Sequence, residues 1–338
     1  CVRPGESTVR VHFEDLVETV TFTVPYPHAV PGPVAAGDSF IDRHVATKLA
    51  ALRIPSAPLC DDATFLRRAY VDLICTLPTA AEVKTFLADT AGDKRAALVE
   101  ELLQRPEFVD YWTLQLADLL QNRKERDHDV RGTKGVRSFH AWLRRQVEQN
   151  RGWDDIARDV LTSSGSSFEH PEVGYYVVTV GEKRPTETSE VVDSVAQSFL
   201  GTRIGCARCH NHPLEKYTQD DYYHFAAFFA RVGLDRHKPE DGPTILVQAS
   251  NERMQLLRRI DQLEKRLEAA KAVQVRQPRT GAMLSPRPLD RQELQLDPAD
   301  DPREALVEWL VDPGNEFFSG AMVNRLWKHF LGTGLVEP

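Results

Sequence analysis

The sequence predicts a mainly α-helical protein that begins with a short β-hairpin and contains few other strands. Two observations support this fold class. Apolar and polar residues alternate over residues 5–24, which is typical of half-buried strands, whereas apolar residues recur every three to four positions from Phe40 onward, which is typical of helices. With 338 residues, of which 41% are hydrophobic and 27% charged, the chain can bury a sizeable core.

The alternating N-terminal segment predicts a hairpin. Its apolar positions are Val9, Val11, Phe13, Val20, Phe22 and Val24. Because an isolated two-stranded hairpin is only marginally stable in water, we expect it either to be the remnant of a β-sandwich or to pack on the next domain. Prolines and a glycine over residues 25–33 predict a linker after it.

A helical body is predicted over residues 38–235, because helix-starting signals recur through it. Thr79 and Glu82 have the spacing of a capping box, in which side chain and main chain satisfy each other's end groups. Pro106 suits the first turn of a helix, and Ser138 has the side chain of a residue that starts one.

Two helices are predicted around the cysteine-rich part of this body. Residues 186–200 form a strongly amphipathic pattern and lead the chain to Cys206, and residues 220–230 form a phenylalanine-rich pattern after it. Residues 174–180 are rich in tyrosine and valine and predict a short strand.

Three further segments follow. Residues 250–273 predict a charged helical arm, since apolar residues recur at helical spacing among charged ones. Residues 274–301, rich in proline, arginine and aspartate, predict a linker. Residues 302–338 predict two helices, which we expect to be the truncated start of a C-terminal helical domain.

The charge and hydropathy of the chain exclude two classes of partner. The formal net charge is -8, and arginine-rich runs alternate with acidic residues, so a nucleic-acid-binding role has no compositional support. No stretch of about 18 apolar residues occurs, so no transmembrane segment is predicted.

The sequence Cys206-Ala207-Arg208-Cys209-His210 has the spacing of a c-type haem attachment site. Two thiols three positions apart can form thioether bonds to the two vinyl groups of one porphyrin. The histidine that follows is then held beneath the iron and offers a ring nitrogen to it. The motif therefore predicts one covalent haem c, attached at Cys206 and Cys209, with His210 as an axial ligand of the iron.

Other interpretations of the motif remain open. A structural zinc site could use Cys206, Cys209 and one or two of His210 and His212, although such sites usually take ligands from two separated segments. A dithiol redox pair is the next alternative, but the strand-then-helix context of thioredoxin-like proteins is missing. His212 follows His210 too closely to reach the opposite haem face, so we expect it outside the iron's own ligands, for example bonded to a propionate.

The ligand on the far side of the iron is not identified by the sequence. The candidates are His140, His170, His224, Met254, Met283, Tyr222 and Tyr223. For each histidine and methionine taken singly, a structural role is the more common one. A five-coordinate iron is the alternative, and it would be open to peroxide or small-ligand chemistry.

Two other cysteines allow a disulfide. Cys60 and Cys75 can pair in an oxidising compartment. The alternative is that both are buried thiols. Cys1 is left over from an odd total of five cysteines.

The residues around the haem motif resemble the planctomycete cytochrome C-like domain over about residues 40–240. The resemblance rests on Phe65–Arg68, Leu77-Pro78-Thr79, Phe199-Leu200-Gly201, Cys206–Pro213, Thr218–Tyr223 and Ala226–Phe229. It implies an extracytoplasmic protein, in the periplasm or on the cell surface, with a c-type haem, and it implies no defined reaction. Cys75 departs from the family pattern, in which a small residue such as glycine is expected.

Further resemblances concern the neighbouring segments. Asn324-Arg325-Leu326-Trp327 and Gly332–Val336 resemble the start of the planctomycete-specific domain, and Pro278-Arg279-Thr280-Gly281 fits the connector before it. The N-terminal hairpin resembles the end of a bacterial Ig-like domain. Residues 1–33 are therefore expected to be that end, followed by the proline-rich linker.

Three functions compete at this point. The first is electron transfer to or from a redox partner protein or an attached domain. The second is a haem-dependent oxidoreductase linked to polysaccharide breakdown, which requires an exchangeable position on the iron. The third is a non-catalytic interaction or assembly module stabilised by zinc. Metal analysis separates the third from the other two.

Overall fold

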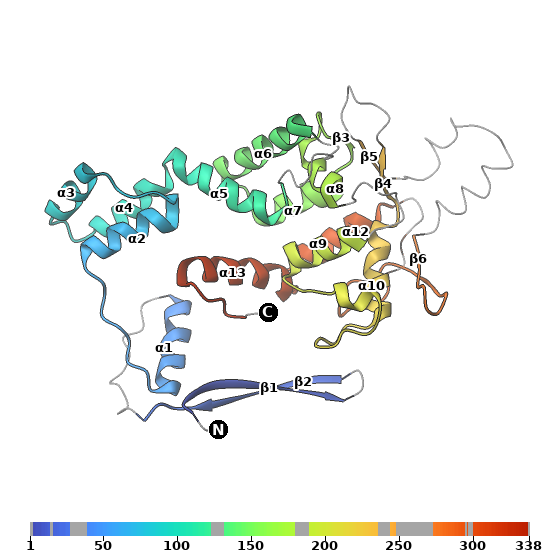
Figure 1. The fold of residues 1–338 in the computed structure, drawn as a ribbon, viewed down its shortest axis with the longest axis horizontal. Coiled ribbons are helices and arrows are strands. Elements are labelled where there is room, and N and C mark those ends of the chain that lie inside the picture. Colours follow the sequence, from blue (N-terminus) through green and yellow to red (C-terminus); the bar gives the residue numbers. More distant parts are fainter. Residues whose placement is uncertain are drawn as a thin grey trace. The chain divides into compact units, whose positions relative to one another are not determined.

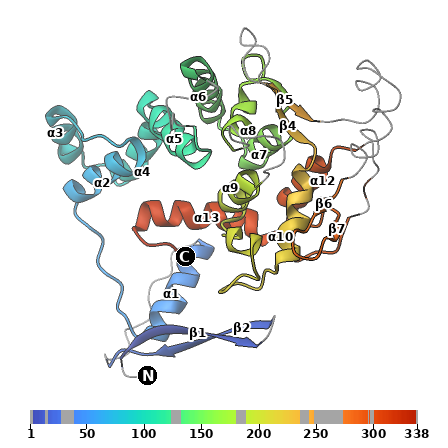
Figure 2. The same ribbon diagram turned by 45° about the vertical axis from the view of Figure 1, so that its right-hand side comes forward.

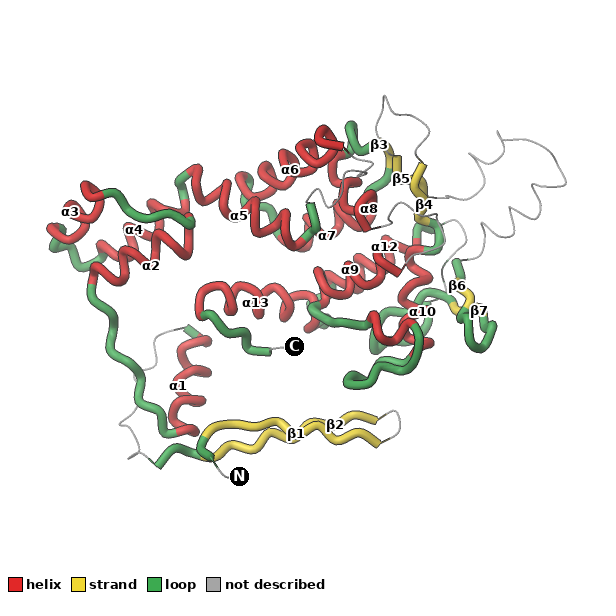
Figure 3. Tube along the Cα trace, in the orientation of Figure 1, coloured by secondary structure: helices red, strands yellow, loops and turns green. Residues whose placement is uncertain are grey.

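The computed structural model describes residues 3–13, 16–27, 39–122, 132–179, 189–235, 244–247, 273–294, 296 and 300–336. It divides into two compact units, of which the first is Cys1–Phe65 with Leu214–Lys216 and the second is Leu66–Pro213 with Tyr217–Pro338. Helices dominate both the chain and the second unit, so the predicted mainly α fold class is confirmed (Figure 1, Figure 3).

The first unit contains the predicted hairpin and one helix. Strands β1 (Gly5–Phe13) and β2 (Leu16–Val24) pair antiparallel, with Val9 opposite Val20. Helix α1 (Phe40–Leu52) begins at the N-cap Ser39, whose hydroxyl accepts from the Asp42 N–H over 3.0 Å. An ion pair between Lys48 and Glu6 joins α1 to the hairpin. The apolar side chains Val9, Val11, Val20 and Phe22 remain 48–53% exposed.

Four short helices follow, in the order that the caps predict. They are α2 (Asp62–Ile74), α3 (Ala80–Ala88), α4 (Lys94–Leu103) and α5 (Pro106–Leu119). The capping box before α3 is confirmed, since the Thr79 N–H donates to Glu82 over 2.6 Å and the Glu82 N–H donates to the Thr79 hydroxyl over 3.3 Å. Pro106 occupies the first turn of α5, as predicted.

Two local predictions in the next region are wrong. Helix α6 (Gly132–Glu148) begins well before Ser138, because Val136 and Phe139 already continue its apolar face. Residues 174–179 form the short helix α8 (Gly174–Thr179) and not a strand. Tyr175 and Tyr176 are both fully buried there, and a short, wholly apolar run does not distinguish a strand from a buried helix.

The remaining elements around α8 are short. Helix α7 (Trp153–Thr162) is followed by β3 (Gly165–Ser166) and the 3-10 helix η1 (Pro171–Val173). Strands β4 (Val232–Asp235) and β5 (Thr244–Val247) complete a small antiparallel sheet in the order β3–β5–β4. These strands agree with the expectation of few strands beyond the hairpin.

The cysteine motif is bracketed by helices. Helix α9 (Ser189–Leu200) leads to the 3-10 helix η2 (Gly205–Arg208), and α10 (Gln219–Ala226) with η3 (Ala227–Phe229) follows it. The predicted charged arm over residues 250–273 lies outside the described residues except for Val273. Within residues 273–294, which we call the connector, β6 (Val275–Arg276) and β7 (Met283–Leu284) form a small hairpin.

The last two helices share the core of the second unit. Helices α12 (Pro302–Val311) and α13 (Glu316–Leu331) pack on α7 and α9 respectively (Figure 2). Trp153 of α7 lies between Phe199 and Phe318, at ring distances of 5.1 and 6.2 Å. Leu306, Val307 and Leu310 are fully buried. Since each such side chain stabilises the fold by about 1.5–3 kcal/mol, α12 is part of this core.

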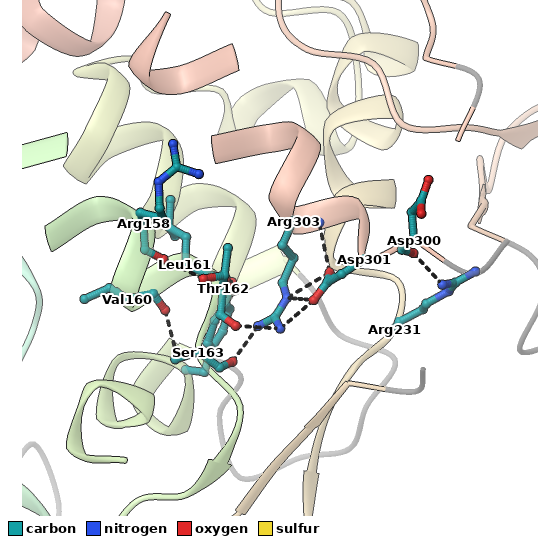
Figure 4. A network of polar contacts seen from close by, with 10 residues as sticks. Arg158, Val160, Leu161, Thr162, Ser163, Arg231, Asp300, Asp301 and Arg303 are labelled. Carbon is teal, nitrogen blue, oxygen red and sulfur yellow. Dashed lines mark hydrogen bonds and ion pairs between the residues drawn. The ribbon is translucent and has the colours of Figure 1, made fainter. Parts of the chain in front are cut away.

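A buried arginine fixes the start of α12 to the end of α7 (Figure 4). Arg303 is 1% exposed, and its guanidinium donates to the carbonyls of Ser163 (2.7 Å) and Thr162 (3.0 Å) and pairs with Asp301 (2.8 Å). Helix ends leave their last carbonyls unsatisfied and negatively polarised, which is the position where a cation is most useful. We call this arrangement the Arg303 clamp.

Candidate functional site

The Cys206–His210 segment forms an exposed turn between α9 and α10. The Cys209 N–H donates to the Cys206 carbonyl over 3.3 Å, which closes the turn between the two cysteines. Cys206 and Cys209 are thiols, and both are exposed together with His210. Two accessible thiols on one turn, followed at once by an accessible imidazole, form a donor set that fits a covalently attached porphyrin.

Buried residues hold this turn from below. Ile204 and Ala207 are almost fully buried, and the Ala207 N–H donates to the Ile204 carbonyl over 2.9 Å. Gly201 follows α9 with φ at 64°, and a Cβ atom there would lie 3.0 Å from the Cβ of Ala321 on α13. The chain therefore leaves α9 through a glycine that no other residue could replace without strain.

The ring of His210 is oriented by the residue after it. Its Nδ1 lies 2.7 Å from the Asn211 carbonyl. A carbonyl only accepts, so this contact places the proton on Nδ1 and leaves Nε2 with its lone pair available. Histidines that bind metals commonly donate their second ring nitrogen to a carbonyl in this way.

The loop after the motif folds back onto α10. The His212 N–H donates to the Tyr217 carbonyl over 2.8 Å, and the Asn211 side chain accepts from the Gln219 N–H over 3.0 Å. Thr218 and Asp221 form a capping box at the start of α10. His212, expected outside the iron's own ligands, is half-buried in this loop, and its role stays a prediction.

One carbonyl of the turn receives two donors from α10. The Arg208 carbonyl accepts from Gln219 Nε2 over 3.0 Å and from the Tyr223 hydroxyl over 3.1 Å. Gln219 and Tyr223 are four residues apart and so lie on the same face of the helix. That face holds the turn at the residue between Ala207 and Cys209.

A partly buried carboxylate lies behind the turn. In the described part of the chain, Asp193 Oδ1 is buried without a hydrogen-bond partner. Burial raises the pKa of Asp193, while the positive charge of Arg208 opposes this shift. A Cβ atom at Gly205 would lie 3.1 Å from both carboxylate oxygens, so the glycine leaves space for this side chain.

The two tyrosines of α10 stay protonated at neutral pH. Burial raises the pKa of Tyr222 far above its ordinary value, and the charge of Asp193 adds to the shift. Burial also raises the pKa of Tyr223, although Arg208 opposes this. Tyr223 therefore keeps the hydroxyl proton that it donates to the Arg208 carbonyl.

The candidates for the far side of the iron lie on several elements. His224 is buried on α10, but its Nδ1 lies 2.7 Å from the Ser285 carbonyl of the connector. His224 and Asp220 share one face of α10, where Asp220 accepts from Gln277 of the connector and His224 contacts Ser285. His170 pairs with Glu172 at 3.5 Å, and His140 is exposed on α6. Met283 is exposed on β7, and Met254 lies outside the described residues.

The predicted disulfide between Cys60 and Cys75 is not supported. Both residues are thiols. They flank the two ends of α2, whose 13 residues span about 20 Å, whereas bridged cysteines need Cα atoms within about 7 Å. The expectation of buried thiols is also wrong for Cys75, which is exposed at φ 53° just after the helix.

A ready-made zinc centre is not visible in the described ranges. No group of three or more histidine, cysteine, aspartate or glutamate side chains is arranged there to hold a metal ion. A zinc site at Cys206 and Cys209 would thus need ligands from residues that the structure does not describe, or a rearranged turn.

Sequence reasoning missed two residues of this site, Gln219 and Asp193. The capping box of Thr218 and Asp221 was visible in the sequence, and it places Gln219 in the first turn of α10. The partners of its side chain, however, come from residues 208, 277 and 279, and no local pattern indicates such pairing. Asp193 looks like an ordinary polar position of an amphipathic helix.

Comparison with known families gives two matches. Residues 40–233 match the family PSCyt2, described as a protein of unknown function (DUF1549). Residues 302–338 match the family PSD1, likewise described as a protein of unknown function (DUF1553). Neither a curated protein nor a solved structure matches the chain. The first match spans more than half of the chain and contains the Cys206–His210 turn.

Proposed function

The chain belongs to the PSCyt2 family, and from this membership together with the Cys206–His210 turn we propose that it is a c-type haem protein that transfers electrons. The observation that supports the proposal most directly is the exposed turn, with two thiols and one oriented imidazole in five consecutive residues. The resemblance of the flanking residues to the planctomycete cytochrome C-like domain adds to it.

Each residue of the turn has a defined part in this proposal. Cys206 and Cys209 would hold the haem, each S–H adding across one vinyl double bond of the porphyrin with no group leaving. His210 would offer Nε2 to the iron, because its Nδ1 proton is held by the Asn211 carbonyl. The bound haem would supply a one-electron redox couple.

The surroundings of the turn suit a fixed redox centre. Ile204 and Ala207 anchor it to the core, and Gln219 and Tyr223 hold the Arg208 carbonyl. A rigid turn would hold the His210 ring in one position relative to the two cysteines. The redox partner is another protein or an attached domain. None of the described helices is long and apolar enough to cross a membrane. The location outside the cytoplasm follows from the family resemblance.

The sixth position of the iron separates electron transfer from the second function, a haem-dependent oxidoreductase linked to polysaccharide breakdown. His224 and His170 are each engaged through Nδ1, the same ring nitrogen that is engaged in His210, so Nε2 of either ring remains a candidate for the far side of the iron. Carbon monoxide binding to the reduced protein measures this directly. Binding would favour the oxidoreductase, and failure to bind would favour electron transfer.

The proposal is tested by producing the full chain in a host that matures c-type cytochromes. A pyridine haemochrome spectrum should show one covalent haem per chain. Replacing Cys206 and Cys209 with serine should abolish it, whereas Cys75→Ser, which removes an exposed thiol elsewhere, should leave it unchanged. A wild-type protein without covalent haem, or one loaded with zinc, would refute the proposal.

A further inference from the structure

Gln219 is a buried polar side chain beside the turn, with hydrogen bonds on both sides of its carboxamide. It is 3% exposed and lies in the first turn of α10, directly after the N-cap Thr218. Its main-chain N–H and both ends of its carboxamide are hydrogen-bonded. A buried amide with all of its groups satisfied has one stable orientation, because any rotation leaves donors or acceptors unpaired.

Two of these hydrogen bonds reach the residues that flank Cys209 and His210. Gln219 Nε2 donates to the carbonyl of Arg208, the residue before Cys209, over 3.0 Å. The Gln219 N–H donates over 3.0 Å to the side chain of Asn211, the residue after His210. Asn211 in turn accepts the His210 ring proton on its own carbonyl. The two residues between these contacts are therefore fixed at both ends.

The other two hydrogen bonds of Gln219 reach the connector. Gln219 Oε1 accepts from Gln277 Nε2 and from Arg279 Nε, each over 3.1 Å. Gln277 is fully buried, and its own Oε1 accepts from the N–H groups of Arg279 (2.7 Å) and Thr280 (2.6 Å). Because its Oε1 is already used, Gln277 presents its NH2 group to Gln219. The orientation of one carboxamide therefore determines that of the other.

From these contacts we propose that Gln219 is a positioning residue of the haem-attachment turn, and that it couples the turn to the connector through Gln277 and Arg279. This inference rests on the proposed function for its meaning, but the contacts exist in the chain itself. Gln219 sets where His210 lies relative to the two cysteines. The connector, predicted as a linker, is then part of the site.

The decisive variant is Gln219→Glu. A carboxylate still accepts from Gln277 and Arg279, and the main-chain N–H still donates to Asn211, but the carboxylate cannot donate to the Arg208 carbonyl, so only the side-chain bond to the turn is lost. Gln146→Glu is the matched control. Gln146 is also buried, at 5% exposed, donates its Nε2 to the Trp142 carbonyl (3.1 Å) and accepts from Arg151 (2.9 Å), on a helix without the motif.

The first measurement is hydrogen exchange of residues 206–217 in the full chain produced without haem. Gln219→Glu should speed exchange in this segment about tenfold, the effect of one lost hydrogen bond, while Gln146→Glu should leave it unchanged. Tyr223→Phe, which removes only the second donor to the Arg208 carbonyl, should act in the same direction by less. It keeps the test decisive if Gln219→Glu does not fold.

The second measurement concerns the loaded protein. In Gln219→Glu the haemochrome band should shift towards that of haem with a single thioether bond, and Gln277→Leu should produce a smaller shift of the same sign. Unchanged exchange in both Gln219→Glu and Tyr223→Phe, or an equal change in Gln146→Glu, would overturn the proposal. Absence of haem from the wild-type chain would refute the proposed function. The exchange comparison would still test whether Gln219 positions the Cys206–His210 turn.

Discussion

Two buried polar side chains of this protein, Arg303 and Gln219, each connect segments that are distant in the sequence, but they differ in charge and in surroundings. Arg303 donates to the carbonyls of Thr162 and Ser163 at the end of α7, and Gln219 donates to the carbonyl of Arg208 in the turn. Each side chain thereby ties an earlier segment of the chain to a later one. Arg303 is charged, pairs with Asp301 and lies within the aromatic core, over the ring of Tyr176 at 5.3 Å. Gln219 is neutral and lies under an exposed turn. We therefore expect Arg303 to affect mainly the free energy of unfolding. We expect Gln219 to affect mainly the position of the Cys206–His210 turn.

The hydrogen bonds of Arg303 join the two segments that match known families. Arg303 belongs to the segment that matches PSD1, and its acceptors Thr162 and Ser163 belong to the segment that matches PSCyt2. The two matched segments thus share one core in this chain. Helices α12 and α13 should unfold together with α7 and α9.

The largest effect is expected from breaking the Arg303 clamp. Arg303→Ala leaves the Asp301 carboxylate without its cation and leaves the Thr162 and Ser163 carbonyls at the end of α7 without their donor. Breaking a buried pair in this way costs about 3–5 kcal/mol. Urea unfolding followed by circular dichroism measures the loss. Arg291→Ala, which removes an exposed arginine of the connector, should change stability by less than about 0.5 kcal/mol.

The second prediction tests whether α12 belongs to the same core as α7 and α9. Leu306→Ala leaves the clamp intact but removes a fully buried side chain of α12, and should cost about 3 kcal/mol. If α12 belongs to the common core, the whole helical signal should still be lost in one transition. A separate early transition of α12 and α13, with the rest unaffected, would show that Arg303 joins two independent units.

A third, solvent-accessible contact gives a smaller effect that depends on pH. Hydrogen bonds from the Thr79 main chain and hydroxyl, and then from Tyr70 and Arg105, lower the pKa of Glu82 from its usual 4.5 to about 2. Because this pKa is lower in the folded protein, the stabilisation is complete above pH 4.5 and is lost as the pH falls towards 2. The melting temperature of Glu82→Gln should therefore depend less on pH in this window than that of the wild type.

The smallest effect has the opposite sign. Burial raises the pKa of Asp193, so its charge destabilises the fold at neutral pH. Asp193→Asn keeps the shape beside Gly205 and should raise the free energy of unfolding at pH 7 by less than about 1 kcal/mol. The gain should vanish at pH values where Asp193 is protonated in both states. A variant that is less stable at pH 7 would show that this carboxylate has a partner when the protein is loaded.

The sequence predicted the parts of the fold that depend on local chemistry. The Thr79–Glu82 capping box, the start of α5 at Pro106 and the hairpin all follow from residues near one another in the chain. The strand predicted over residues 174–180 failed because Tyr175 and Tyr176 are buried on every side, so no period distinguishes helix from strand. Helix α2 lies between Cys60 and Cys75, and its length holds the two thiols apart.

The same division holds at the site. The spacing of Cys206, Cys209 and His210 is readable directly, because the chemistry needs those residues next to one another. The role of Gln219 could not be predicted from the sequence, since it depends on Gln277 and Arg279 about sixty residues away. Arg303 is hidden for the same reason, as its acceptors lie 140 and 141 residues upstream. Long-range polar partners are visible only in the folded chain.

The central claim is that one haem joins Cys206 and Cys209, and trypsin offers the most direct test. Cleavage after Arg203, Arg208 and Lys216 separates the two cysteines into the peptides 204–208 and 209–216. These peptides should remain joined through a haem after reduction, because thioether bonds survive a reductant. Two separate peptides with unmodified thiols would contradict it, and so would a pair that a reductant releases, which would identify a disulfide.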